Sequence, residues 1–275
     1  DLRPALQVLA AQIASALNAA QVFNQTLEHQ KIAQELEFAG KIQASFLPAQ
    51  IPQVEGWQFT ASLHPARETS GDFYDFIPLP DGNIGVVVAD VTDKGFGAAL
   101  FMALSRTLIR SQAFQFPADP AGVLTAANRR ILMDAQAGLF VTTFYGVLNP
   151  ENGEMKYANA GHNPPFLFSP KNSTPNKILK ATGVPLGLFA DAVWKQDTIK
   201  IEPLSTLVLY SDGITEAQNA AEEFFGPERL LQVVGANLED SAGHVQNAII
   251  VSVKEFVGNA PRSDDLTLVL IRHKS

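Results

Sequence analysis

Apolar residues in the first part of the chain recur at alternating steps of four and three positions. The series runs through Leu2, Leu6, Leu9, Ile13, Ala16, Ala20, Phe23 and Leu27. A seam kept over more than three heptads predicts a long helix with a narrow apolar stripe. The phase breaks at residues 28–31, and Pro48 and Pro52 end the helical pattern. We therefore predict a helical linker or coiled-coil stalk over residues 1–46 and a separate domain over residues 47–275.

Two interpretations of this helix stay open. It can be a parallel dimerising stalk that carries a signal from an upstream module, with the phase break at residues 28–31 as the switch. It can instead be an amphipathic helix packed on its own domain. The narrow, alanine-rich stripe ahead of a self-sufficient domain favours the stalk, and therefore a homodimer.

From Trp57 onward the pattern changes to short apolar runs separated by turn residues. Predicted strands cover residues 57–65, 71–79, 83–90, 141–148, 155–159, 165–168, 193–201, 204–210 and 265–271. Predicted helices cover residues 95–112, 120–135, 227–238 and 241–256. Blocks of strands followed by pairs of helices indicate an α+β fold in which helices cover stacked antiparallel sheets. The polar segment 169–177 is predicted to be a mobile loop.

Composition excludes several classes of protein. The net charge of −8 and the lack of a Lys/Arg-rich patch argue against a nucleic-acid partner. The chain has no cysteine, which excludes disulfides and thiolate metal sites and fits a reducing, cytoplasmic compartment. Unbroken apolar runs, such as residues 84–89, are far shorter than the roughly 20 residues of a membrane span, so no membrane segment is expected. Because the chain begins with Asp1 rather than Met, we expect a fragment of a longer protein.

Four aspartates lie where predicted strands begin or end. They are Asp72 in Ser-Gly-Asp, Asp90 in Val-Ala-Asp, Asp212 in Ser-Asp-Gly and Asp264 in Ser-Asp-Asp. Carboxylates at strand ends can converge in space, and clusters of them suit hard cations such as Mg²⁺ or Mn²⁺. Each motif alone is also typical of an ordinary turn or helix cap. The set of four together suggests a metal-dependent hydrolase on a sheet scaffold.

With their flanking residues, these motifs resemble the SpoIIE/RsbU-like bacterial branch of the metal-dependent PP2C (PPM) serine/threonine phosphatases. The resemblance covers about residues 42–271. It is supported by the runs QASFLP at 43–48, AALFMA at 98–103, ANAGHNPP at 158–165, TGVPLG at 182–187 and FG at 225–226. The stalk resembles the helical linker that joins such phosphatases to sensor modules, and its first turns resemble the closing helix of a GAF domain.

The resemblance implies a four-layer α-β-β-α sandwich with a centre for two Mn²⁺ or Mg²⁺ ions. Asp90 would bridge both ions, while Asp212 and Asp264 would complete one of them. Asp72 would support the other ion, partly through water, and Val91 would contribute its backbone carbonyl. Direct ligation by Asp265 is not expected, since relatives vary at this position.

Several positions depart from the family pattern or have two interpretations. Thr92 stands where eukaryotic relatives have a histidine suited to protonating the leaving group. Arg67 is either the phosphate-binding arginine or a plain surface residue, and Lys94 either touches substrate phosphate or is solvated. His162 is expected to be structural rather than catalytic. Asp93 is acidic where many relatives have glycine, and could supply a further carboxylate.

The resemblance thus implies a protein serine/threonine phosphatase that uses metal-activated water. Its implied substrate is a phosphorylated anti-sigma-factor antagonist of the STAS type. Residues 35–47 resemble the regulatory helix that reaches the metal site in this branch. The first rival is a catalytically silent phosphatase fold that binds a signalling partner. The second is a metal-dependent phosphodiesterase or nuclease, which the acidic charge disfavours.

Overall fold

Two five-stranded antiparallel sheets form the centre of the molecule. The computed structural model describes residues 2–135, 138–170 and 172–274. One sheet, here sheet A, has the order β1 (Trp57–His64), β10 (Leu266–His273), β9 (Thr206–Tyr210), β6 (Phe166–Phe168) and β7 (Lys177–Ile178). The other, sheet B, has the order β2 (Phe73–Pro78), β3 (Ile84–Val91), β4 (Val141–Leu148), β5 (Glu154–Ala160) and β8 (Asp197–Lys200). The short helix η1 (Pro80–Gly82) forms the predicted turn between β2 and β3.

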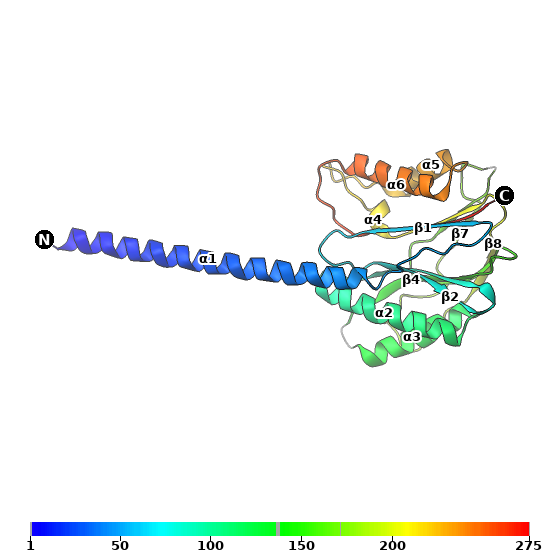
Figure 1. The fold of residues 1–275 in the computed structure, drawn as a ribbon, viewed down its shortest axis with the longest axis horizontal. Helices are drawn as coiled ribbons and strands as arrows, with labels where there is room; N and C mark the ends of the chain where they lie inside the picture. Colours follow the sequence, from blue (N-terminus) through cyan, green and yellow to red (C-terminus); the bar gives the residue numbers. More distant parts are fainter. Residues whose placement is uncertain (1, 136–137, 171, 275) are drawn as a thin grey trace.

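Helices cover the outer face of each sheet (Figure 1). Sheet B packs against α2 (Phe96–Gln115) and α3 (Pro120–Asp134), and sheet A packs against α5 (Gly226–Ala236) and α6 (Ala242–Val257). The predicted α+β fold and its α-β-β-α layering are therefore confirmed.

Three apolar layers hold the sandwich together. One lies between the sheets, one between sheet B and its helices, and one between sheet A and its helices. Strand β3 reads Ile-Gly-Val-Val-Val-Ala-Asp-Val, because its two faces serve two different apolar layers and both are buried. The polar ends of such strands then emerge where the layers stop.

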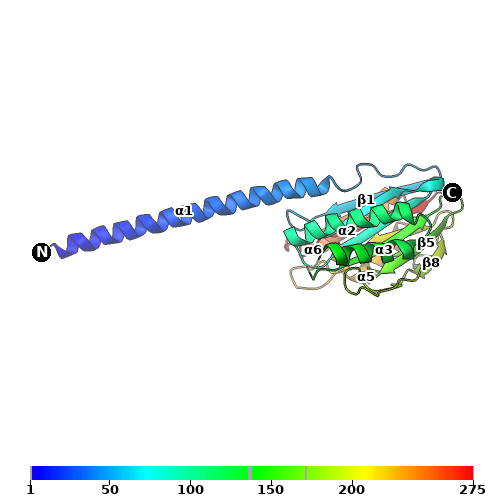
Figure 2. The ribbon, with the colours of Figure 1, turned by 90° about the horizontal axis from the view of Figure 1, so that it is seen from below.

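Helix α1 (Arg3–Ala44) projects from the sandwich, and only its last turns approach α2 (Figures 1 and 2). The large seam residues, such as Leu6, Ile13 and Phe23, are exposed along its length. This arrangement rules out packing of the seam against the chain's own domain.

Within the described residues, α1 is the one helix long and apolar enough to cross a membrane, with a mean hydropathy of 1.3 over a window in Leu6–Ala44. The prediction of no membrane segment relied on unbroken apolar runs, so the predicted helix was not considered as a possible membrane span. Its residues 4–27 contain polar but no charged side chains. Signal sequences and helices of soluble proteins pass the same length-and-composition test. The cytoplasmic location therefore stays a prediction.

Three local predictions need correction. Of the predicted strand over 193–201, only Asp197–Lys200 forms β8. The reason is that Trp194 is buried beside sheet B and donates from Nε1 to the carbonyl of Val184 at 2.8 Å. Segment 169–177 ends by joining the edge of sheet A as β7, while residue 171 lies outside the described residues. The turn at Ser211-Asp212-Gly213 is the single-turn helix α4 (Asp212–Thr215).

Candidate metal centre

The four predicted aspartates come from both sheets and meet at one end of the sandwich. Asp72 and Asp90 lie one position beyond the cross-strand pair Phe73–Ala89 of β2 and β3, so they face each other. Asp212 follows β9 and Asp264 precedes β10, which are neighbours in sheet A. The antiparallel pairing of strands therefore delivers all four carboxylates to one place.

Asp72 is the most deeply buried member of this cluster, with 2% of its surface exposed. Its Oδ2 accepts a short hydrogen bond from the hydroxyl of Thr267, which belongs to the other sheet. Its backbone N–H donates to Oγ of Ser70 at 3.0 Å. Burial raises the pKa of Asp72 well above its usual range, and the charge of Asp90 raises it further.

Mutual repulsion also perturbs the other members. Burial, followed by the charge of Asp212, raises the pKa of Asp90 to about 7. Burial, followed by the charges of Asp264 and Glu216, raises the pKa of Asp212 to about 6. Each ionised carboxylate therefore destabilises its neighbours unless a cation lies among them.

Lys94 supplies one positive charge to the cluster. Its Nζ lies 2.7 Å from Oδ2 of Asp264 and donates to the carbonyl of Ser263 at 2.6 Å. This ion pair differs from the full solvation considered for Lys94, and the phosphate contact stays a prediction. The ion pair fastens the turn after β3 to the segment before β10, across 170 positions of sequence.

Asp265 organises the loop before Asp72. Its Oδ1 accepts from the N–H of Ala66 at 2.7 Å, and its Oδ2 accepts from the hydroxyl of Ser70 and the N–H of Gly71. Both oxygens are therefore engaged by donors of the chain itself, and the role of Asp265 at a metal stays a prediction. The backbone at Gly71 runs so close to β3 that a Cβ there would lie 3.1 Å from the carbonyl oxygen of Val91.

Three other residues considered for the site, Arg67, Thr92 and Asp93, form no hydrogen bond or ion pair with the four carboxylates within the described part of the chain. Arg67 is exposed on the loop after β1, and no ion pair or hydrogen bond joins its side chain to any described residue. Thr92 exchanges hydrogen bonds of 3.1 Å with both the carbonyl and the N–H of Phe140. Thr92 thus fastens the end of β3 and is not free to act as an acid. Asp93, proposed as a further carboxylate, is exposed on the turn after β3.

His162 is buried, with 2% of its surface exposed, and its Nδ1 lies 2.9 Å from the hydroxyl of Thr142. That hydroxyl donates to the carbonyl of Asp90 at 3.3 Å. Burial lowers the pKa of His162 to about 4, so the ring is neutral near pH 7 and supplies no general acid. This geometry agrees with the expected structural role.

The low pKa of His162 predicts a loss of stability in mild acid. Between its ordinary pKa of 6.5 and about 4, the unfolded chain binds a proton that the folded chain does not. At pH 5 this costs about 2 kcal/mol of unfolding free energy relative to pH 7. The carboxylates with raised pKa act in the opposite direction, so the comparison must be with His162→Gln. Urea unfolding should show that the unfolding free energy of the wild type, relative to that of His162→Gln, falls by this amount between pH 7 and pH 5. An unchanged difference would contradict the low pKa of His162.

Sequence reasoning missed the hydroxyl residues that orient the acids. Thr267 and Ser70 bind Asp72 directly, and Ser211 donates from Oγ to the carbonyl of Asp265 at 3.2 Å. Thr267 lies two positions after Asp265, on the same face of the strand. This spacing of two residues, which places side chains on the same face of a strand, was the sequence signal that could have identified Thr267.

The residues present fit divalent cations in chemistry. Carboxylate and carbonyl oxygens are hard ligands, and the pKa values of these acids are raised by burial and, next, by their neighbouring carboxylates. Within residues 2–135, 138–170 and 172–274, no three Asp, Glu or His side chains converge tightly enough to form a completed cage. The carboxylates therefore interact electrostatically without forming a completed cation cage.

Comparisons with known proteins agree with this fold. The family model described as Stage II sporulation protein E (SpoIIE) matches residues 80–274. Protein IcfG of Synechocystis is 33% identical over 86% of this chain, and the phosphoserine phosphatase RsbU of Bacillus subtilis is 32% identical over 91%. The matches span 41% of IcfG and 74% of RsbU.

Among solved structures, the SiaA-PP2C domain of Pseudomonas aeruginosa superposes with a TM-score of 0.78. The match covers 89% of this chain and 98% of that domain at 21% identity, which establishes the shared fold. The chain therefore belongs to the SpoIIE family and contains a PP2C-type serine/threonine phosphatase domain similar to that of RsbU.

Proposed function

We propose that the chain removes phosphate from phosphoserine or phosphothreonine on a signalling protein, using two Mn²⁺ or Mg²⁺ ions. The observation that carries this proposal is the cluster of Asp72, Asp90 and Asp212, in which burial, and next the charges of neighbouring carboxylates, raises the pKa of each member. The similarity to a phosphoserine phosphatase supports the same reaction. We further propose that the domain boundary lies at residues 46 and 47.

In the proposed centre, Asp90 would lie between the two cations. Asp212 and Asp264 would hold one of them, and Asp72 with the Val91 carbonyl would support the other. Such ions supply Lewis acidity, which lowers the pKa of water and neutralises phosphoryl oxygens.

The remaining residues fix the geometry of this centre. Thr267 holds Asp72 in one orientation, and Asp265 fixes the loop that ends at Gly71. Lys94 must share Asp264 with, or yield it to, an incoming cation, because its Nζ lies at that carboxylate. Thr92 and His162 are both engaged elsewhere, so neither is assigned as the proton donor to the leaving alkoxide in this proposal.

The substrate class can be tested with three compounds. The full chain with Mn²⁺ should release phosphate from a phosphoserine peptide and from p-nitrophenyl phosphate, but leave bis-p-nitrophenyl phosphate intact. Asp212→Asn should abolish both reactions. Cleavage of the diester at a comparable rate would favour a phosphodiesterase, and binding without turnover of any ester would favour the silent interaction module.

A phosphorylated anti-sigma-factor antagonist of the STAS type remains our proposal for the physiological substrate. It rests on the similarity to RsbU and on no contact within the structure. Incubating such a phosphoprotein with the chain and following the loss of its phosphate would test it directly.

The stalk contacts the site through its last turns. Gln43, which is buried, accepts from the N–H of Ser70 at 2.9 Å and donates back to the Ser70 carbonyl. A Cβ on Gly40 would lie 2.0 Å from the carbonyl oxygen of Glu68, so only glycine permits this close approach. Since the Ser70 hydroxyl bonds both Asp265 and the N–H of Asp72, a movement of α1 reaches the carboxylate cluster through one residue.

We propose that two copies pair through α1 and that this pairing sets activity. Beyond the phase break, an apolar groove lies between α1 and α2, and Phe38, Ile42 and Leu100 help to line it. Inserting one residue within 28–31 rotates the two parts of α1 by about 100° relative to each other. This insertion should change basal turnover several-fold, while a seven-residue insertion, which restores the heptad phase, should not. Equal rates in all three proteins would contradict transmission through α1.

A further inference from the structure

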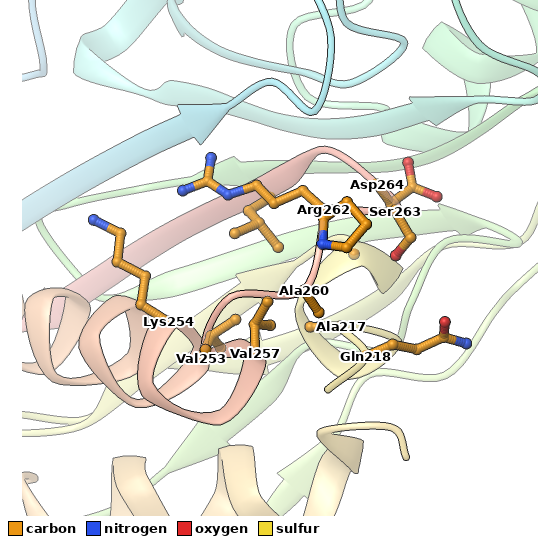
Figure 3. Close-up of a pocket in the computed structure, with 13 residues that line it drawn as sticks. Ala217, Gln218, Val253, Lys254, Val257, Ala260, Arg262, Ser263 and Asp264 are labelled. Carbon is orange, nitrogen blue, oxygen red and sulfur yellow. The ribbon is translucent and has the colours of Figure 1, made fainter. Parts of the chain in front are cut away.

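A pocket of about 290 Å³ opens beside the carboxylate cluster (Figure 3). It lies between the last turn of α6, the segment 258–264 and the residues that follow α4. Asp264 and Gly213 line it, and Asp264 and the neighbour of Gly213, Asp212, belong to the cluster. A ligand that fills the pocket would therefore lie next to whatever is bound at the cluster.

Two basic side chains on the pocket wall, Lys254 and Arg262, have no partner among the described residues. Lys254 and Arg262 form no salt bridge or side-chain hydrogen bond with any residue that the structure describes. Figure 3 shows both side chains extending to the same side, away from Asp264. Burial lowers the pKa of the nearby His64, and the charges of Arg262 and Lys254 lower it further. The positive charges of Lys254 and Arg262 therefore both lie near His64, in a chain whose net charge is −8.

The rest of the wall suits a short apolar stem. Val253, Val257 and Ala260 line the pocket between the basic residues and α4. A ligand with one or two methylene groups and a terminal anion can pack its stem there while Lys254 and Arg262 bind the anion. Aspartate and glutamate side chains have this chemistry.

We propose that the pocket is a specificity subsite for an acidic side chain that flanks the phosphorylated residue of the substrate. The proposal rests on the phosphatase function proposed above, because it places the phosphoryl group at the adjoining carboxylate cluster. An acidic protein repels acidic peptides unless local positive charge receives them, and this pocket supplies that charge. Substrates with an acidic residue close to the phosphoserine should therefore be preferred over neutral ones.

The test compares pairs of phosphoserine peptides of otherwise neutral sequence. Each pair carries glutamate or glutamine at one position, two or three residues before or after the phosphoserine. For the full chain with Mn²⁺, kcat/KM should favour glutamate by about tenfold at one or more positions, or about 1.4 kcal/mol. The double variant Lys254→Glu/Arg262→Glu should abolish or reverse this ratio. Lys195→Glu/Arg129→Glu makes the same change of charge at exposed positions outside the pocket and should preserve it.

Two results would overturn the subsite. One is an equal kcat/KM for glutamate and glutamine peptides at every position in the wild-type protein. The other is an equal loss of kcat/KM for both peptides in the pocket variant. That result would mean that Lys254 and Arg262 bind the phosphoryl group itself. Fluorescence anisotropy of the same labelled peptides, without metal, measures the binding ratio independently of turnover. A chain that hydrolyses no ester but still prefers glutamate peptides would refute the phosphatase proposal and keep the anion pocket.

Discussion

Replacing Asp90 with asparagine should abolish turnover and, in the absence of metal, make the protein more stable. The pKa of Asp90 is raised to about 7, so its stabilising contribution is fully present below its ordinary pKa of 3.8 and is lost as the pH rises through 7. At pH 8 the ionised carboxylate costs up to about 4 kcal/mol in the metal-free fold. Asp90→Asn removes that cost, because an amide carries no charge.

Metal should reverse the order of stability. Mn²⁺ should raise the melting temperature of the wild-type protein, whose cluster gains the missing positive charge, and have little effect on Asp90→Asn. Turnover of the variant should fall by about a hundred- to a thousandfold, the loss typical for removal of one charge-stabilising group. Asp191→Asn, which removes the same charge from an exposed loop, serves as the control. A metal-free Asp90→Asn protein that melts below the wild type would contradict the repulsion at the cluster.

Replacing Asp75 with alanine should cause the largest loss of stability among single substitutions of charged residues outside the cluster. Asp75 lies in β2 with 1% of its surface exposed and accepts from Nη1 of Arg110 at 2.9 Å through both oxygens. Arg106 binds the same carboxylate at 2.9 Å from Nη2. Burial raises the pKa of Asp75, and the two arginines oppose that shift.

The substitution leaves two arginines without their anion at the junction of β2 and α2. Breaking a buried pair in this way typically costs about 3–5 kcal/mol, a large part of a domain's stability. Urea unfolding of Asp75→Ala at pH 7 should show this loss, and Asp197→Ala, at an exposed pair with Lys177, should lose less than about 1 kcal/mol. Similar losses in the two variants would show that the Asp75 network contributes little.

The layered fold could be predicted because apolar residues recur with different periods along its strands and its helices. The heptad seam, the apolar strands β3 and β9 and the helix pairs all follow from local patterns. The burial of Trp194 could not be predicted, because it depends on how the segment after Gly183 packs against sheet B. A window of a few residues holds no information about such packing.

The candidate site was predictable at the level of its four acids and not at the level of their partners. Acids at strand ends are visible in sequence, and the family resemblance assigns their roles. The ion pair of Lys94 with Asp264 joins segments 170 positions apart, so no local pattern could announce it. Lys254 and Arg262 likewise become a pocket wall only when α6 packs beside the segment before β10.

The most direct measurement is hydrolysis of p-nitrophenyl phosphate by the full chain after treatment with EDTA and after the return of Mn²⁺ or Mg²⁺. We expect no turnover without metal, recovery when either ion is returned, and none in Asp212→Asn under any condition. Turnover that survives EDTA, or that persists in Asp212→Asn with Mn²⁺, would contradict a metal-dependent centre at these carboxylates.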